Sequence, residues 1–518
     1  MKTLYRSQLA LTAALAVLAG SAYGTQPPDS VTSDGYYNTA MGSFALNDLT
    51  SGTHNTAAGD FTLYSNTTGS NNTAYGADAL VANSSGDSNT AFGTDVLQGN
   101  TTGASNTAYG AFALYYNSTG YDNTATGFSA LYSNKTGNYN TAAGDEALFS
   151  NTTGSNNTAS GYEALHSNTG GSGNVAAGYF ALVSNTTGSD NTATGTFTLN
   201  NNTTGGNNTA TGTDALASNT TGADNVATGA SALAYNTTGN DNIASGYSAL
   251  YSNTTGADNT ASGYQALYSN TTADFNTASG YGALYSNNGV SNTASGYEAL
   301  YANTSGTENT ASGVHALASN TTGSNNIADG YHAGFNLTTG SNNIDIGSPG
   351  VAAESGVIRI GTITGTTSTQ SAAYVAGIYG VKTGTAGTAV FIDSSGQLGT
   401  VSSSIRYKED VQPMASASER LLELRPVKFR YKKADASGEK PIQYGLIAEE
   451  VAKVYPELVV RDATTGRIDG VRYEELAPML LNELQQLKKQ VAALSKQNQS
   501  MQATLLKLNS KGPGLAMQ

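Results

Sequence analysis

The chain has 518 residues, with 23 Lys and Arg against 37 Asp and Glu, so its net charge at pH 7 is −14. It has no Cys, which excludes disulfides, thiolate zinc sites and cysteine nucleophiles, and we expect no metal and no cofactor. Only 12% of residues are charged and 61 are Gly, which favours an internal repeat, and the acidic balance argues against a nucleic-acid partner.

The first 24 residues have the pattern of a secretory signal peptide. Two basic residues precede an apolar run from Leu9 to Leu18, and small residues two apart, Ala22 and Gly24, follow it. We predict cleavage after Gly24. The apolar run is short for a membrane span, and no later run reaches 18 apolar residues. The mature chain is therefore expected to be secreted or on the cell surface, without an integral membrane anchor.

A repeat of 17 residues follows. Its anchor asparagine recurs from Asn38 to Asn343 in steps of 17, with a single step of 16 between Asn276 and Asn292. One copy reads Asn-Thr-Ala-x-Gly-Tyr-x-Ala-Leu-Tyr-x-Asn-Thr-Thr-Gly-x-x. The period is too short for two packed helices, and Asn, Thr and Gly are poor helix formers. We therefore predict a mainly β fold in which residues 25–347 form a β-solenoid with one coil per copy.

Each copy is divided by its turn residues. We predict a strand at Asn-Thr-Ala, a corner at Gly, a second strand at Tyr-x-Ala-Leu-Tyr and a turn at Asn-Thr-Thr-Gly. Ala and Leu would fill a thin core, and Asn and Thr would stack on their equivalents in the next coil. A disordered polar tract is the alternative, but disorder gives no reason to keep the Ala-Leu pair in phase.

On the Asn-Thr-Ala-x-Gly element, the repeats resemble the head repeats of trimeric autotransporter adhesins of the YadA type. Those repeats have a shorter period built round Ala-x-Gly. The resemblance implies trimeric β-rolls on a cell surface, with the chain itself and a host or environmental glycan or surface ligand as partners. The Asn-Thr-Thr-Gly turn departs from that family. Residues 348–402 are predicted to form a β-rich neck, with strands at 357–360 and 373–378 and a strand–turn–strand over 390–401.

The composition changes at residue 403. Only five basic residues precede that position, and the others lie between Arg406 and Lys511. Several blocks follow in order, among them Ser403-Ser404-Ile405-Arg406-Tyr407-Lys408, Leu424-Arg425-Pro426-Val427, Tyr444-Gly445-Leu446-Ile447 and Pro456-Glu457-Leu458. They resemble the peptidase S74 domain, the intramolecular chaperone of endosialidase and phage tail-spike proteins. The resemblance implies a small α+β domain over residues 403–478 that promotes trimer assembly and then cuts itself off.

That resemblance also implies the site residues. Ser403 would be the nucleophile and Lys408 its basic partner, Arg406 matches the motif arginine, and the cut would fall between Ser402 and Ser403. Ser404 departs, because the family often has Asp at that place.

The residues of the module limit the chemistry independently of the resemblance. The module has no His and no Cys, so a nucleophilic mechanism would need Ser or Thr with Lys or a carboxylate as base. Lys serves as a base only where burial or nearby charge lowers its pKa. The alternative is a Ser-rich linker with a solvated Lys. Because Ser402 and Ser404 flank Ser403, the position of the nucleophile is fixed only to within one residue.

The end of the chain has a heptad pattern. Leu484, Val491, Asn498 and Leu505 share one core position, which predicts a coiled coil over residues 479–510. A lone amphipathic helix that packs on its own domain is the alternative. Three chains fit both resemblances, although the pattern does not fix the number.

These predictions combine into one hypothesis and one rival. The hypothesis is a secreted, trimeric, adhesin-like fibre whose C-terminal module assembles it and leaves as a single-turnover serine endopeptidase. In the rival, the trimerisation domain is retained, and the rod is a structural or adhesive element or a glycan-binding or ice-binding solenoid.

Overall fold

The computed structural model describes residues 32–361, 363–364, 367–368, 390–392, 398–400, 402–433, 438–462 and 465–510. The predicted signal peptide at residues 1–24 and the predicted strand at 373–378 lie outside the described residues. The chain divides into two compact units, Met1–Ser371 and Ala372–Gln518, and each is described by itself.

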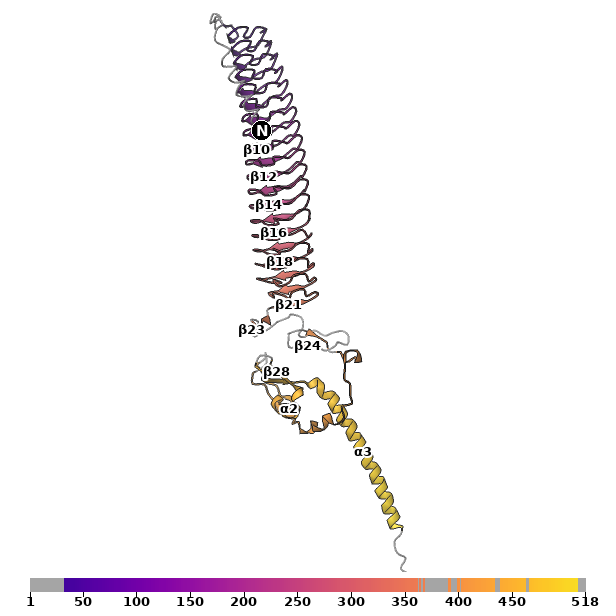
Figure 1. The fold of residues 1–518 in the computed structure, drawn as a ribbon. Helices are drawn as coiled ribbons and strands as arrows, with labels where there is room; N and C mark the ends of the chain where they lie inside the picture. The colour runs from indigo at the N-terminus through magenta and orange to yellow at the C-terminus, as the bar shows by residue number, and fades with distance from the viewer. Residues whose placement is uncertain are drawn as a thin grey trace, which may run out of the picture. The chain divides into compact units, whose positions relative to one another are not determined.

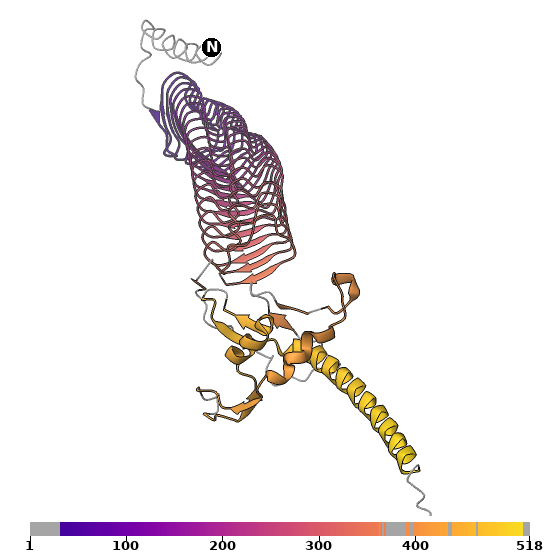
Figure 2. The same cartoon turned by 60° about the horizontal axis from the view of Figure 1, so that its bottom comes forward.

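The first unit is a column of stacked coils (Figures 1 and 2). The short strand β1 (Thr32–Ser33) pairs antiparallel with β2 (Thr39–Met41), and 20 strands from β2 to β21 (Ile358–Ile360) then pair in parallel, each with the strand of the next coil. The strands between them are β3 (Thr56–Ala58), β4 (Thr73–Tyr75), β5 (Thr90–Phe92), β6 (Thr107–Tyr109), β7 (Thr124–Thr126), β8 (Thr141–Ala143), β9 (Thr158–Ser160), β10 (Val175–Ala177), β11 (Thr192–Thr194), β12 (Thr209–Thr211), β13 (Val226–Thr228), β14 (Ile243–Ser245), β15 (Thr260–Ser262), β16 (Thr277–Ser279), β17 (Thr293–Ser295), β18 (Thr310–Ser312), β19 (Ile327–Asp329) and β20 (Ile344–Ile346). The predicted β-solenoid is confirmed.

The first strand and the glycine corner of each coil are as predicted. The middle residue of a strand, such as Ala244 in β14, is buried, and the residues on either side point outward because side chains alternate along a strand. Gly246 then turns the chain with a φ of 136°. A Cβ atom there would lie 2.4 Å from the carbonyl oxygen of Gly263 in the next coil, so only Gly fits this corner.

The predicted second strand is wrong. The segment after the corner is a series of turns, in which Ser248 and Leu250 have φ values of 52° and 51°. Ala249 and Leu250 are adjacent and both fully buried. An extended strand points neighbouring side chains to opposite faces and cannot bury both. The turns direct both into the core, while the Leu250 N–H still donates to the Ala266 carbonyl oxygen of the next coil at 2.9 Å.

Two ladders of buried asparagine hold the coils in register. In the ladder of anchor residues, Asn225 Nδ2 donates to Asn208 Oδ1 at 3.1 Å and to the Gly239 carbonyl oxygen at 2.9 Å. Asn225 Oδ1 in turn accepts from the backbone N–H of Asn242 at 3.0 Å. A parallel ladder runs through the turn asparagines, such as Asn219. The predicted stacking of Asn on Asn is therefore confirmed.

Breaking the anchor ladder is expected to destabilise the rod locally. Asn225→Ala leaves the buried Asn242 N–H without a partner. Asn208 Oδ1 and the Gly239 carbonyl each lose one bond, but they keep the residue 225 N–H and Asn236 Nδ2 respectively. A buried orphan costs about 1–3 kcal/mol, so we expect a loss in that range. Hydrogen exchange would measure it as lost protection in the neighbouring coils. Thr209→Ala on the exposed strand face should change protection little, and equal effects from the two variants would contradict the ladder account.

The rod ends in two irregular coils. The strand predicted at 357–360 is β21, and it extends the parallel stack past residue 347, where the sequence places the neck. The turn ladder stops because Leu337 stands where the next Asn would be, which leaves the Oδ1 atom of Asn320 without a partner. Asp345 takes the place of the core Ala in β20 and is 1% exposed.

Asp345 is a buried carboxylate at the last coil. Among the described residues, neither of its oxygens makes a hydrogen bond of ordinary geometry, although the Ser348 side chain is near enough to favour the charged form. Burial raises the pKa of Asp345 to about 6 and Glu354 adds to the effect, while Ser348 and then Arg359 oppose it. Arg359 itself is bound to Glu354, with Nη2 and Oε2 2.7 Å apart.

This carboxylate makes the end of the rod sensitive to pH. The pKa in the folded chain lies above the value of about 3.9 for an unfolded Asp. The contribution of Asp345 to the free energy of unfolding is therefore fully present below about pH 4, where this carboxyl is protonated in both states. It is lost as the pH rises through about 6. After correction for intrinsic rates, the amides of residues 344–360 should exchange more slowly at pH 4.5 than at pH 7. Asp345→Asn should abolish that difference and Asp329→Asn on the surface should keep it. A difference that survives Asp345→Asn would contradict the assignment.

In the second unit, the two strands of the predicted strand–turn–strand are β24 (Phe391–Ile392) and β25 (Leu398–Gly399), which pair antiparallel. The turn between them lies outside the described residues. A further short hairpin, β22 (Ile363–Thr364) with β23 (Thr367–Ser368), precedes it in the first unit. The module after residue 402 is α+β. Its elements are the 3-10 helices η1 (Ile405–Tyr407), η2 (Ala415–Glu423) and η3 (Pro456–Leu458), the hairpins β26 (Val427–Phe429) with β27 (Gln443–Gly445) and β28 (Val459–Arg461) with β29 (Ile468–Val471), and the helices α2 (Ala448–Val454) and α3 (Tyr473–Asn509).

A small core joins these elements. Leu421 of η2, Val451 of α2, Leu458 of η3 and Met479 of α3 are buried against one another. Ser418 ties η2 to α3, because its hydroxyl donates to Glu483 Oε1 at 2.6 Å and accepts from Asn482 Nδ2 at 2.6 Å. The first turns of α3 therefore belong to the folded module.

Candidate cleavage and assembly site

The predicted cleavage site lies on an exposed turn at the start of the module. Ser402, Ser403 and Lys408 flank η1, whose first cap is Ser404. The Lys408 N–H closes the turn by donating to the Ile405 carbonyl oxygen at 3.2 Å. A single helical turn therefore separates the two residues that the resemblance assigns to catalysis.

Ser404 and Arg406 contact each other within this turn. Arg406 Nε donates to Ser404 Oγ at 3.2 Å, and the Arg406 backbone N–H approaches the same oxygen at 3.4 Å. Ser404 stands at the position for which the resemblance implies Asp, so the acceptor that Arg406 meets here is a neutral hydroxyl. A neutral acceptor binds a guanidinium less strongly than a charged one does.

Ser403 and Lys408 are both exposed in the single chain. Within the part of the chain that the structure describes, no hydrogen bond joins Ser403 Oγ to Lys408 Nζ. A hydroxyl becomes a nucleophile only when a base accepts its proton, and an ammonium group becomes a base only when it is desolvated. One helical turn separates Ser403 from Lys408 along the chain. For Lys408 to act as a base, a further surface has to bury it.

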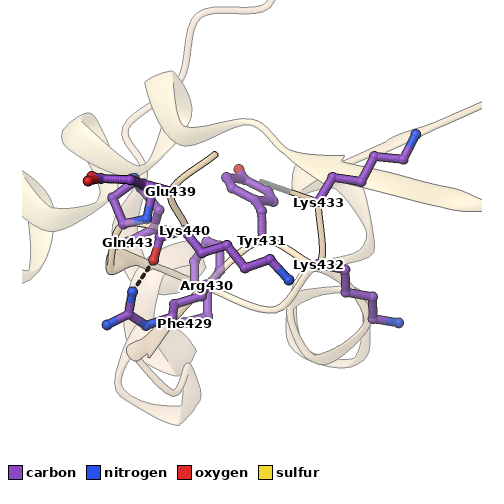
Figure 3. Close-up of a pocket in the computed structure, with 9 residues that line it drawn as sticks. Phe429, Arg430, Tyr431, Lys432, Lys433, Glu439, Lys440 and Gln443 are labelled. Atoms are coloured by element: carbon purple, nitrogen blue, oxygen red, sulfur yellow. Dashed lines mark hydrogen bonds between the residues drawn. The ribbon is translucent and has the colours of Figure 1, made fainter. Parts of the chain in front are cut away.

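A cavity of about 730 Å³ lies in the hairpin of β26 and β27 (Figure 3). Phe429 and Tyr431 line it together with the basic residues Arg430, Lys432, Lys433 and Lys440. The Arg430 guanidinium donates to the carbonyl oxygen of Lys440, which the figure marks as a dashed line. Neither Ser403 nor Lys408 lines this cavity, so the sequence-based site and the cavity are separate.

The helix α3 presents an apolar face that its own module leaves uncovered. Its seam residues are between 56 and 65% exposed: Leu480, Leu484, Leu487, Val491, Leu494, Met501, Leu505 and Leu508. In both views the C-terminal half of α3 runs clear of the rest of the module (Figures 1 and 2). The alternative of a helix packed on its own domain holds only for the first turns, around Met479. In the described ranges, no helix combines the length and apolarity needed to cross a bilayer.

The comparisons with known proteins bear on this module. Residues 403–460 match the family model of the chaperone of endosialidase, peptidase S74. The match begins at the predicted nucleophile, Ser403. The comparisons with curated proteins and with solved structures gave no match. The matched segment thus runs from η1 into β28, while the likeness of the repeats to adhesin heads rests on the repeat residues alone.

The structure also identifies residues that the sequence reasoning missed. Ser418, Asn482 and Glu483 form the polar link between η2 and α3, 64 and 65 positions apart in sequence. Their only local signal is that Asn482 and Glu483 are polar residues between Leu480 and Leu484, the first two residues of the heptad seam. A contact of that separation cannot be read from residue spacing.

Proposed function

We propose that the protein is a secreted, trimeric surface fibre whose C-terminal module gathers three chains and then removes itself by cleavage before Ser403. The observation that carries the proposal is the match over residues 403–460, followed directly by the uncovered seam of α3. Ser403 is the nucleophile, Lys408 the base, and Arg406 supports the turn that holds them.

The seam supports self-association. A sustained repeat of apolar side chains in alternating steps of three and four gives the narrow seam along which the helices of a coiled coil pack on one another. Asn498 stands at a core position of the seam, and a polar residue there selects register and oligomer number. Bringing chains together through α3 raises the local concentration of the rods. Within one chain each rod strand pairs with the strand of the next coil, as Val226 pairs with Ile243, so the step that needs help is bringing separate chains into register. Surfaces left exposed until the chains meet are prone to misassembly, which gives an assembly device a physical use.

Cleavage follows from assembly in this proposal. Lys408 is exposed in the single chain, and packing of neighbouring chains around η1 supplies the burial that a lysine base requires. Ser403 Oγ then attacks the carbonyl carbon of Ser402 while Lys408 accepts its proton. The peptide nitrogen of Ser403 leaves with a proton, and water releases the ester. Loss of the module makes assembly irreversible.

The coupling of the two steps can be tested by dilution. Denatured full-length chain is refolded at a series of protein concentrations, and the appearance of the C-terminal fragment is followed on gels. The rate per chain should rise with concentration, because three chains must meet before cleavage. A rate that does not depend on concentration would contradict coupling, and absence of the fragment at every concentration would favour the rival with a retained module.

A further inference from the structure

Two ladders of tyrosine run along four consecutive coils of the rod, those of β14 to β17. One ladder follows the glycine corner and contains Tyr247, Tyr264, Tyr281 and Tyr297. The other follows the buried leucine and contains Tyr251, Tyr268, Tyr285 and Tyr301. Within each ladder successive ring centroids are 5.0–5.2 Å apart, with planes inclined by 3–14°. We call these eight residues the tyrosine patch.

The fold does not require the tyrosine patch. The coils of β12 and β13 have Thr213 and Ala217, and Ala230 and Ala234, at the same two positions. Those coils keep the same strands, and their core leucines Leu216 and Leu233 are fully buried. The tyrosines are therefore surplus to folding, which indicates a role at the surface.

The patch is rigid and accessible. Tyr247, Tyr264, Tyr281, Tyr297 and Tyr301 are between 36 and 52% exposed. Because each ring is stacked on the next, the rings inside a ladder have their faces covered and are reached at their edges. Side chains that are already ordered lose little entropy when a ligand binds. Tyrosine also offers an apolar body and a hydroxyl that donates and accepts.

The charges near the tyrosine patch limit the class of ligand that it can bind. In the segments from Gly246 to Ser252 and their equivalents in the next three coils, Glu298 is the one carboxylate, and it lies 3.4 Å from His315 Nδ1. Such a surface offers little attraction to a basic peptide. Anionic polymers are disfavoured by the acidic rod, which has Lys135 and Arg359 as its basic residues over 25–361.

We propose that the tyrosine patch binds a neutral, extended polysaccharide that lies along the rod. The rings of each ladder repeat every 5.0–5.2 Å along the rod, which is close to the advance of one pyranose ring in an extended β-1,4-linked chain. Successive sugars would therefore meet equivalent rows of ring edges and hydroxyls. The inference deepens the proposed function, since it rests on an exported rod that faces its surroundings, and it names the site and class of the ligand.

The test uses the assembled wild-type protein with two probes, cellohexaose and chitohexaose, in titration calorimetry. The main variant combines Tyr251→Ala, Tyr268→Ala, Tyr285→Ala and Tyr301→Ala, which copies the natural Ala217 and Ala234. The control combines Ile243→Ala, Thr260→Ala, Thr277→Ala and Thr293→Ala on the strand face of the same four coils. Light scattering on every sample measures the assembly separately.

We expect at least one hexaose to bind, the tyrosine variant to bind about tenfold more weakly and the control to stay within about twofold. No binding of either hexaose, or equal binding by the tyrosine variant, would overturn the proposal. A tyrosine variant that changes the mass of the assembly while neither hexaose binds would make the patch a contact between copies and would also overturn it. Because assembly is measured independently, failure of the trimeric fibre is distinguishable from failure of the sugar site.

Discussion

Ser403→Ala is expected to leave the chain whole. In the proposed mechanism the wild-type chain yields a fragment that begins at Ser403 and ends at Gln518. Without the hydroxyl there is no nucleophile, so the fragment should be absent and not merely slower to form. Lys408→Ala should have the same result, and so should Lys408→Arg, because a guanidinium does not give up its proton. Intact-mass spectrometry under denaturing conditions measures all of these directly.

Neighbouring serines provide the matched controls. Ser402→Ala and Ser404→Ala should still yield the fragment, with Ser404→Ala slower because Arg406 loses the acceptor at 3.2 Å. Ser404→Asp should restore a charged acceptor for Arg406 and cleave at least as fast as the wild type. Cleavage in Ser403→Ala together with its loss in Ser402→Ala or Ser404→Ala would move the nucleophile by one residue. An uncut wild-type chain would refute the protease assignment.

Charges in the seam of α3 are expected to abolish assembly. Leu487 and Leu494 lie on the uncovered face and are 56 and 63% exposed in the single chain. The double variant Leu487→Glu, Leu494→Glu should therefore fold as a single chain, yet three copies would bury six carboxylates in one seam. Buried unpaired charges are strongly unfavourable, so we expect monomers by light scattering. Cleavage should fall with assembly, because the burial of Lys408 depends on it.

A charge change of the same size elsewhere on the helix is the control. Lys489 and Lys496 lie on the helix away from the seam, and Lys489→Gln with Lys496→Gln, which also makes each chain more negative by two charges, should still assemble. Circular dichroism of both double variants would check that α3 is formed. A seam variant with the mass of the wild type would show that α3 does not hold the chains together.

The sequence predicts the rod well because its repeat converts weak local signals into a strong periodic one. The strand and the glycine corner recur along the whole stack and the asparagine ladders recur in all but the end coils, and the structure confirms all three. The error was in the Tyr-x-Ala-Leu-Tyr segment. Its adjacent Ala and Leu already contradicted the alternation of a strand, and the backbone buries both by placing the leucine at positive φ, which residue propensities do not predict.

The candidate site was less accessible to sequence reasoning. Ser403 and Lys408 come from a resemblance, and the match over residues 403–460 supports the family of that segment without testing these two residues. The polar link between Ser418, Asn482 and Glu483 joins positions more than 60 apart and has no local pattern. The tyrosine patch was visible as letters in the sequence, but only the stacking of coils shows that its rings form two continuous ladders.

The most direct test of the whole account is the native mass of the protein recovered after expression of the full chain. The account predicts a trimer in which every chain ends at Ser402, with the C-terminal fragment released as a separate species. A monomer that ends at Ser402 would contradict the assembly role of the module. A trimer of chains that still end at Gln518 would contradict self-cleavage and leave the module as a retained trimerisation domain.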